Sequence, residues 1–148
     1  MSDWKMGLDN MFKEKVAKAK DDDERIAKNQ KAAEAFTASV VVPAFEELKV
    51  ELEKHGREVR ISPGSTGATL LVTYQGNTEL EYRLHVKVYP TRAVPVPETQ
   101  YYSDGKLWRG EGYLKSGAQD YSIADITKSD IINHFLMDYK LHVHGKLA

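Results

Sequence analysis

Residues 79–88 alternate apolar and polar side chains without a break, and this pattern most narrows the folds open to the chain. One set is apolar: Leu80, Tyr82, Leu84, Val86 and Val88. The other set is polar or charged: Glu79, Glu81, Arg83, His85 and Lys87. A strand with this period of two covers a core with one face and meets water with the other. The segment therefore predicts an antiparallel sheet with one polar face.

The first 55 residues instead repeat their apolar side chains at steps of three and four, the period of an amphipathic helix. We expect a second helix to begin at Asp21–Asp23, because carboxylates are favourable near a helix N-terminus. Pro43 removes one backbone hydrogen bond and should kink or divide this second helix. The predicted organisation is an N-terminal amphipathic helix, residues 1–20, followed by a single α+β domain, residues 21–148.

Turn residues divide the rest of the chain into two strands before residues 79–88 and a hairpin after them, residues 99–111. Three prolines predict that no regular element crosses residues 90–97. The last helix should begin at Thr127, with Asp130 placed for a capping box. We predict an α+β two-layer sandwich, in which an antiparallel meander of four to five strands carries a long kinked N-terminal helix and a C-terminal helix on one face.

Composition excludes several classes of function. The chain has 148 residues, no cysteine and a formal net charge of −1. Thiol nucleophiles, thiolate metal sites and disulfides are therefore absent, and no basic block supports nucleic-acid binding. Residues 1–20 lack the apolar core of a secretory signal, and no apolar run is long enough to span a bilayer. We expect a cytoplasmic protein without a cofactor.

The C-terminal helix carries the sharpest cluster of titratable side chains. His134, Asp138 and His142 recur every four residues and share one helix face. Imidazole and carboxylate at this spacing can chelate a borderline metal, but their order matches no metalloprotease motif and no glutamate is placed as a base. We therefore predict no native metal, keep these three residues as weak candidates, and interpret them as a solvated polar stripe.

For several apolar and aromatic side chains the sequence does not indicate whether they are buried. One histidine also lies on the polar face of the predicted strand. The candidate residues for binding a partner or ligand are Trp4, Leu8, Phe12, His85, Val94, Val96, Tyr101 and Trp108. The aromatic side chains are typical of interaction surfaces, although packing in a sheet explains them equally well. Acidic residues dilute the lysines of the N-terminal helix, so we do not expect it to bind a membrane.

No motif specifies a reaction, so the sequence leaves open whether the protein is an enzyme. Our first hypothesis is a non-catalytic protein-interaction module, of an adaptor or chaperone-like kind, that binds protein and forms a homo-oligomer, most simply a homodimer. The alternative is a small enzyme or ligand-binding protein that uses a cleft between the sheet and the helices. A deep pocket with converging polar groups favours the alternative, and an exposed apolar patch favours the first.

Overall fold

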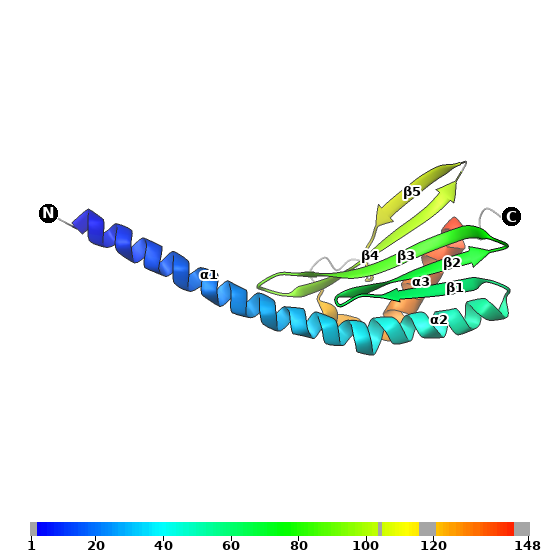
Figure 1. Ribbon diagram of the computed structural model, residues 1–148, viewed down its shortest axis with the longest axis horizontal. Helices are drawn as coiled ribbons and strands as arrows, with labels where there is room; N and C mark the ends of the chain where they lie inside the picture. Colours follow the sequence, from blue (N-terminus) through cyan, green and yellow to red (C-terminus); the bar gives the residue numbers. More distant parts are fainter. Residues whose placement is uncertain (1–2, 104, 116–120, 144–148) are drawn as a thin grey trace.

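The computed structural model describes residues 3–103, 105–115 and 121–143 (Figure 1). It begins with one continuous helical rod, made of α1 (Asp3–Phe36), the π-helical turn η1 (Thr37–Val41) and α2 (Val42–Lys54). The helix boundary expected at Asp21 is wrong, because α1 passes through the acidic run without interruption. No glycine or proline breaks the helix there, and the Asp21 carboxylate pairs with Arg25 at 3.1 Å, a spacing that supports a helix.

The rod changes direction at η1, next to Pro43, where the sequence predicts a kink (Figure 1). Proline has no N–H and cannot continue the ordinary helical ladder. The amide of Val42 instead reaches back five residues to the carbonyl of Thr37, which is a π-helical bond. The Thr37 hydroxyl donates to the carbonyl of Ala33 at 2.8 Å, a bond that often accompanies a bend.

Five antiparallel strands follow one another in the order of the sequence. They are β1 (Glu58–Pro63), β2 (Gly67–Tyr74), β3 (Asn77–Val88), β4 (Ala93–Ser103) and β5 (Lys106–Glu111). The predicted alternation in β3 is confirmed, because Leu80, Tyr82 and Leu84 are fully buried. At the start of β2, a Cβ on Gly67 would lie 2.5 Å from the carbonyl oxygen of Leu84, so glycine is required for this approach to β3.

β4 runs through Pro95 and Pro97, so the expectation that prolines exclude a regular element here is wrong. The N–H and C=O of a strand residue point toward the same neighbouring strand or edge. The carbonyls of Pro95 and Pro97 accept bonds from the Tyr121 hydroxyl and the Gly112 amide, on the side away from β3. The missing N–H groups therefore fall where β4 has no strand partner, and proline is tolerated there.

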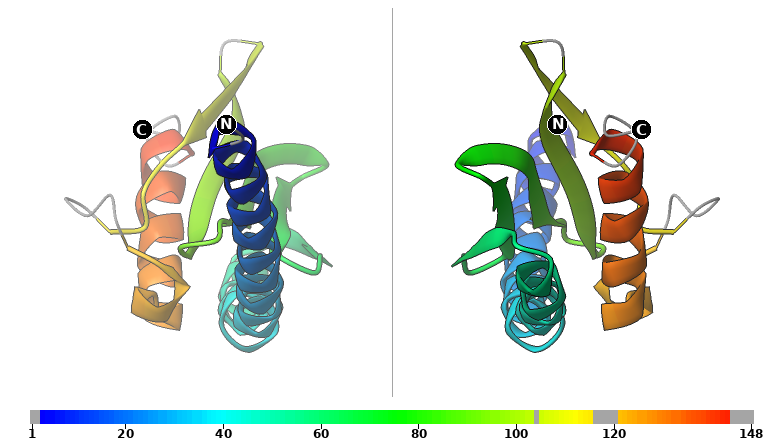
Figure 2. Two further views of the ribbon diagram at one scale, coloured as in Figure 1. Left: turned by 90° about the vertical axis from the view of Figure 1, so that its left-hand side faces the viewer. Right: turned by 90° about the vertical axis from the view of Figure 1, so that its right-hand side faces the viewer.

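α2 and α3 (Lys128–His142) lie side by side on one face of the sheet (Figure 2). A 3-10 turn, η2 (Ile123–Asp125), precedes α3. The core lies between the two layers, where the rings of Phe45 and Phe135 meet Tyr82 edge to face, with centroids 5.9 and 5.4 Å away. The predicted α+β class and its arrangement of helices and meander are confirmed. Within the described residues, no helix combines the length and apolar character that crossing a bilayer requires.

Candidate functional site

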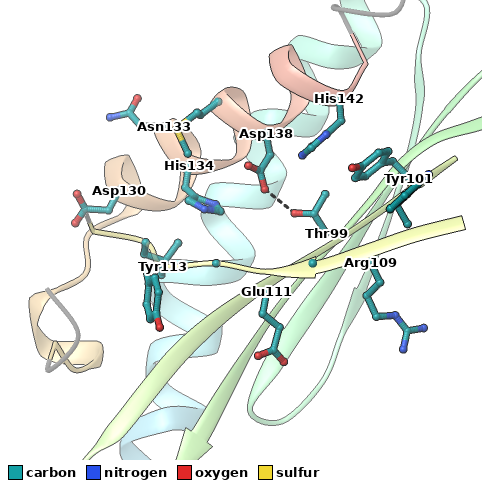
Figure 3. Close-up of a pocket in the computed structure, with 15 residues that line it drawn as sticks. Thr99, Tyr101, Arg109, Glu111, Tyr113, Asp130, Asn133, His134, Asp138 and His142 are labelled. Atoms are coloured by element: carbon teal, nitrogen blue, oxygen red, sulfur yellow. Dashed lines mark hydrogen bonds between the residues drawn. The ribbon is translucent and has the colours of Figure 1, made fainter. Parts of the chain in front are cut away.

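A cavity of about 600 Å³ lies between α3 and the hairpin of β4 and β5 (Figure 3). Its lining combines aromatic rings, carboxylates and imidazoles: Tyr101, Trp108, Tyr113, Asp130, Asp138, His134 and His142. Five residues that the sequence singled out meet here, two from the hairpin and three from α3. The cavity is thus a cleft between sheet and helix of the kind that the ligand-binding hypothesis requires.

The periods of the strands and of the helix place these side chains. In β4, Thr99 and Tyr101 have the same parity as the buried residues Pro95 and Pro97, so they point toward α3. Tyr101 lies directly opposite Trp108 of β5, and the two share this face of the sheet. On α3, steps of four residues turn the two histidines and Asp138 toward the hairpin (Figure 3).

His134 forms the inner wall of the cavity and is only 8% exposed, so the expected solvated position is wrong. Its Nδ1 lies 2.8 Å from the hydroxyl of Tyr82, whose ring is buried in the core. Burial lowers the pKa of His134, which the Asp138 carboxylate opposes, and burial also raises the pKa of Tyr82. A protonated Tyr82 donating to a neutral imidazole fits these directions, and it leaves Nε2–H for the cavity.

The outer part of the cavity is held by two further contacts. The Thr99 hydroxyl donates to the Asp138 carboxylate at 2.6 Å (Figure 3). The rings of Tyr101 and His142 stack with their centroids 3.9 Å apart. All three weak metal candidates on α3 therefore already contact protein groups: His134 contacts Tyr82, Asp138 contacts Thr99, and His142 contacts Tyr101. Metal binding by these candidates stays a prediction.

Three of the predicted binding residues, Trp4, Leu8 and Phe12, lie on the part of α1 that leaves the α+β body (Figure 1). Their exposed fractions are 68%, 43% and 52%. α1 meets the body at Asn29, whose side-chain amide donates to the carbonyl of Tyr89 at 2.7 Å. We call residues 3–28 the free segment of α1. The structure does not bring its apolar side chains to the cavity.

The remaining predicted residues, His85, Val94 and Val96, are half-buried on the face of the sheet that points away from α2 and α3. His85 pairs in register with Val96. Beside them lie Glu98 of β4 and Glu111 of β5, two carboxylates that the sequence analysis did not single out. The register of the predicted hairpin, residues 99–111, was the signal for them, because pairing of Ser103 with Lys106 places Glu98 opposite Glu111.

Comparison with known proteins yields a partial match. The chain is 27% identical to the glycine betaine transporter of Acinetobacter baylyi over 113 residues, which are 75% of this chain and 17% of the transporter. The chain thus spans a small share of that protein's length. No protein-family model matches the chain. No solved structure matches it either.

Proposed function

We propose that the protein is a non-catalytic interaction module that associates with a second copy through the free segment of α1. The observation that carries the proposal is the row of exposed apolar side chains along one side of this segment, at steps of three and four residues: Trp4, Leu8, Met11, Phe12 and Val16. In the whole of α1, only Ala33 and Phe36 are buried. An uncovered helix of this kind is marginal in water, and a contiguous apolar patch is typical of a binding surface.

The order of charges along the helix favours a second copy over another partner. Four of the five lysines before residue 21 lie within residues 13–20, which contain one acidic residue, Glu14: Lys13, Lys15, Lys18 and Lys20. Four acidic residues follow them at once: Asp21, Asp22, Asp23 and Glu24. Two copies of the helix in antiparallel orientation bring each lysine block against the acidic block of the other, and a twofold axis makes both contacts identical.

This pairing also gives the tip of the helix a place to bind. When the centre of each lysine block faces the centre of the partner's acidic block, the numbers of two residues that lie side by side on the two helices add to about 39. The sum is constant because both helices rise equally per residue. Trp4 then lies near Ala35 of the partner subunit, where α1 enters the body. A hollow of about 450 Å³ lies beside that turn, and Phe36, Val40 and Ala93 are among its lining residues. Its lining also includes polar side chains such as Asn29 and Ser39, and an indole ring, with an apolar body and one N–H donor, suits a hollow of this mixed character.

Light scattering coupled to gel filtration tests the proposal. We expect the full chain to be a dimer and Phe12→Asp to be a monomer, because an aspartate would be buried in the interface. The matched control is Val50→Asp on α2, whose side chain is similarly exposed at 55% but lies outside the free segment. A monomeric full chain, or a Phe12→Asp variant that still dimerises, contradicts the proposal.

The cavity at α3 supports a second candidate function, the binding of a small cation with a quaternary ammonium group. Aromatic rings and carboxylates together recognise such groups by cation–π and charge interactions. The cavity offers both, in Tyr101, Trp108, Tyr113 and Asp138. The partial match to a protein named as a glycine betaine transporter makes glycine betaine the first ligand to try.

Trp4 and Trp108 are the two tryptophans of the chain, so a Trp4→Phe variant reports on the cavity alone. We expect glycine betaine to change its fluorescence in a saturable manner, and Asp138→Asn to weaken that binding. A matched variant on the opposite face of the sheet, Lys87→Gln, should leave binding unchanged. A signal that does not saturate, or equal binding by Asp138→Asn, counts against this candidate.

A further inference from the structure

Three side chains from three adjacent strands converge on the open face of the sheet, away from the cavity and from the free segment. They are His85 of β3, Glu98 of β4 and Glu111 of β5, and one imidazole nitrogen and two carboxylate oxygens lie within 4.8 Å of one another. Figure 3 shows Glu111 leaving β5 on the side opposite to α3. The register explains the cluster, because Glu98 lies opposite both Arg83 and Glu111, and His85 follows two residues after Arg83 on the same face.

The two glutamates form an unfavourable pair as they stand. They occupy directly opposite positions of the β4–β5 ladder, where like charges are destabilising. The Glu98 side chain is only 13% exposed, so water screens it little. Arg109 pairs with one oxygen of Glu98 at 3.1 Å, but its own side chain is 62% exposed. Arg83 also lies opposite Glu98 in the β3–β4 register, but it is exposed too, so only exposed cations offset the two facing carboxylates.

His85 provides an independent sign that the cluster lacks a partner. Its Nε2 is fully buried and has no hydrogen-bond partner among the described residues. A buried polar atom without a partner is destabilising, and native structures contain few of them. The imidazole is held close to Gly67, since a Cβ on that glycine would lie 3.3 Å from the Cβ of His85. The Cβ of His85 is therefore held close to the backbone of β2.

The protonation state of His85 suits a ligand to a metal. Burial lowers its pKa, and the positive charges of Arg83 and Lys87 lower it further, while Glu111 and Glu98 act in the opposite direction. Burial and the two cations thus favour the neutral imidazole, which has a lone pair on one nitrogen. Metal coordination requires this neutral form of histidine together with ionised carboxylates.

We propose that His85, Glu98 and Glu111 bind one divalent metal ion of the zinc class, with Nε2 of His85 and one oxygen of each glutamate as ligands. One imidazole and two carboxylates form a set that borderline ions such as Zn²⁺ accept. The ion removes both unfavourable features, because it neutralises the facing glutamates and supplies a partner for Nε2. Three protein ligands leave a tetrahedral ion one position for water or for another ligand.

The geometry needs only a small adjustment. Two ligand atoms at the usual bond lengths to a tetrahedral ion are about 3.4 Å apart, and the ligand atoms here lie within 4.8 Å of one another, so the cluster must contract by at most about 1.4 Å. Glu111 is exposed and can supply this movement by a change of rotamer. Arg83 and Lys87 are exposed cations close to the site, so they keep the affinity moderate and disfavour ions that bind by charge alone. We therefore expect Zn²⁺ to bind and Mg²⁺ not to bind.

Isothermal titration of the full chain with zinc sulfate tests the site, after treatment with EDTA and dialysis. We expect one ion per chain, and a loss of affinity of roughly tenfold or more in each of His85→Ala, Glu98→Gln and Glu111→Gln, since even outer-shell changes often have effects of this size. Two controls remove other histidines: His55→Ala, and the double variant His142→Ala with His144→Ala. Both should bind zinc as the wild type does, and magnesium sulfate should give no binding.

Thermal unfolding separates loss of the site from loss of the fold. In EDTA, Glu111→Gln should melt at the same temperature as the wild type or higher, because it removes the repulsion between the two glutamates. In zinc, the wild type should gain stability and Glu111→Gln should not, since an ion that binds the folded state raises the melting temperature. No zinc binding by the wild type, unchanged binding by His85→Ala and Glu111→Gln, or loss of binding only in the C-terminal double variant overturns the proposal.

Discussion

His134 and Tyr82 show how a polar side chain is accommodated at the edge of the core. The hydroxyl of Tyr82 needs a partner because its ring is fully buried, and the imidazole of His134 provides one at 2.8 Å. The same contact orients the imidazole, so that the other nitrogen lines the cavity. A residue that resembles a surface histidine in the sequence thus has a structural role and a position suited to ligand binding.

This contact predicts a dependence of stability on pH. The pKa of His134 is lowered in the folded state from its ordinary value of 6.5, so the unfolded state binds more protons below that pH. The free energy of unfolding should therefore be highest above pH 6.5 and decrease as the pH falls below this value. Urea unfolding of the wild type and of His134→Gln at pH 7.5 and pH 5 measures this.

His134→Gln should lose part of this dependence of the free energy of unfolding on pH. The pKa of His85 is lowered as well, so His85→Gln should lose a separate part of the same dependence. Equal slopes for the wild type and His134→Gln between the two pH values contradict the assignment of a neutral, buried imidazole.

At the scale of elements, α3 presents the cavity residues, and its start is defined by a local sequence signal. The Asp130 amide donates to the Thr127 hydroxyl at 3.2 Å, and the Thr127 amide donates to the Asp130 carboxylate at 2.9 Å. Ile126 and Ile131 flank this capping box and are both buried, which is the arrangement of a hydrophobic staple. The start of the helix is thus set by groups within a few residues of one another.

Replacement of the cap tests how much this signal contributes. Thr127→Ala leaves the Asp130 amide without its side-chain acceptor and should lower the free energy of unfolding by about 1 kcal/mol. Thr127→Ser keeps the hydroxyl and should lose less than half of that. Equilibrium unfolding in urea measures both variants. Equal losses would show that packing of the threonine methyl group, and not capping, is responsible.

At the scale of the whole molecule, one polar network ties the helical layer to the sheet. The Tyr139 hydroxyl of α3 donates to Glu79 of β3 at 2.7 Å, and Glu79 also pairs with Arg57 at 3.1 Å. Arg57 in turn lies over the ring of Tyr74, 4.1 Å from its centroid. The network joins α3, β2, β3 and the turn after α2 at the end of the sheet that lies far from the free segment.

The network predicts loss of stability at alkaline pH. Burial and the Glu79 contact raise the pKa of Tyr139 from 10.0 to about 12 in the folded state. The folded protein therefore keeps a proton that the unfolded chain releases, and stability should fall as the pH rises through this range. Tyr139→Phe should lower the free energy of unfolding at pH 7 by about 1.5–3 kcal/mol, the size expected for a hydrogen bond to a charged group.

Urea unfolding at pH 7, 10 and 11 compares this variant with the wild type. Above pH 10, the free energy of unfolding should decrease less steeply in Tyr139→Phe than in the wild type. Some dependence should remain, because the pKa of the buried Tyr82 is raised too. A fall as steep as that of the wild type would mean that Tyr139 does not titrate abnormally.

The sequence by itself determined the elements whose signals are local. The alternation of residues 79–88, the cap at Thr127 and the effect of Pro43 each depend on neighbours along the chain, so the strand, the last helix and the bend in the first could be predicted. It also singled out residues on α1, on the open face and at the cavity, but neither Glu98 nor Glu111 of the open face.

Only the tertiary structure decided which of these residues meet. Pro95 and Pro97 fit a strand because their nitrogens point to an edge without a partner, which depends on the position of β5. His134 is buried because Tyr82, 52 residues earlier, lies beneath it. Glu98 and Glu111 reach His85 through the registers of two ladders. Such contacts depend on how strands pair and layers pack, and no single segment of the sequence contains that information.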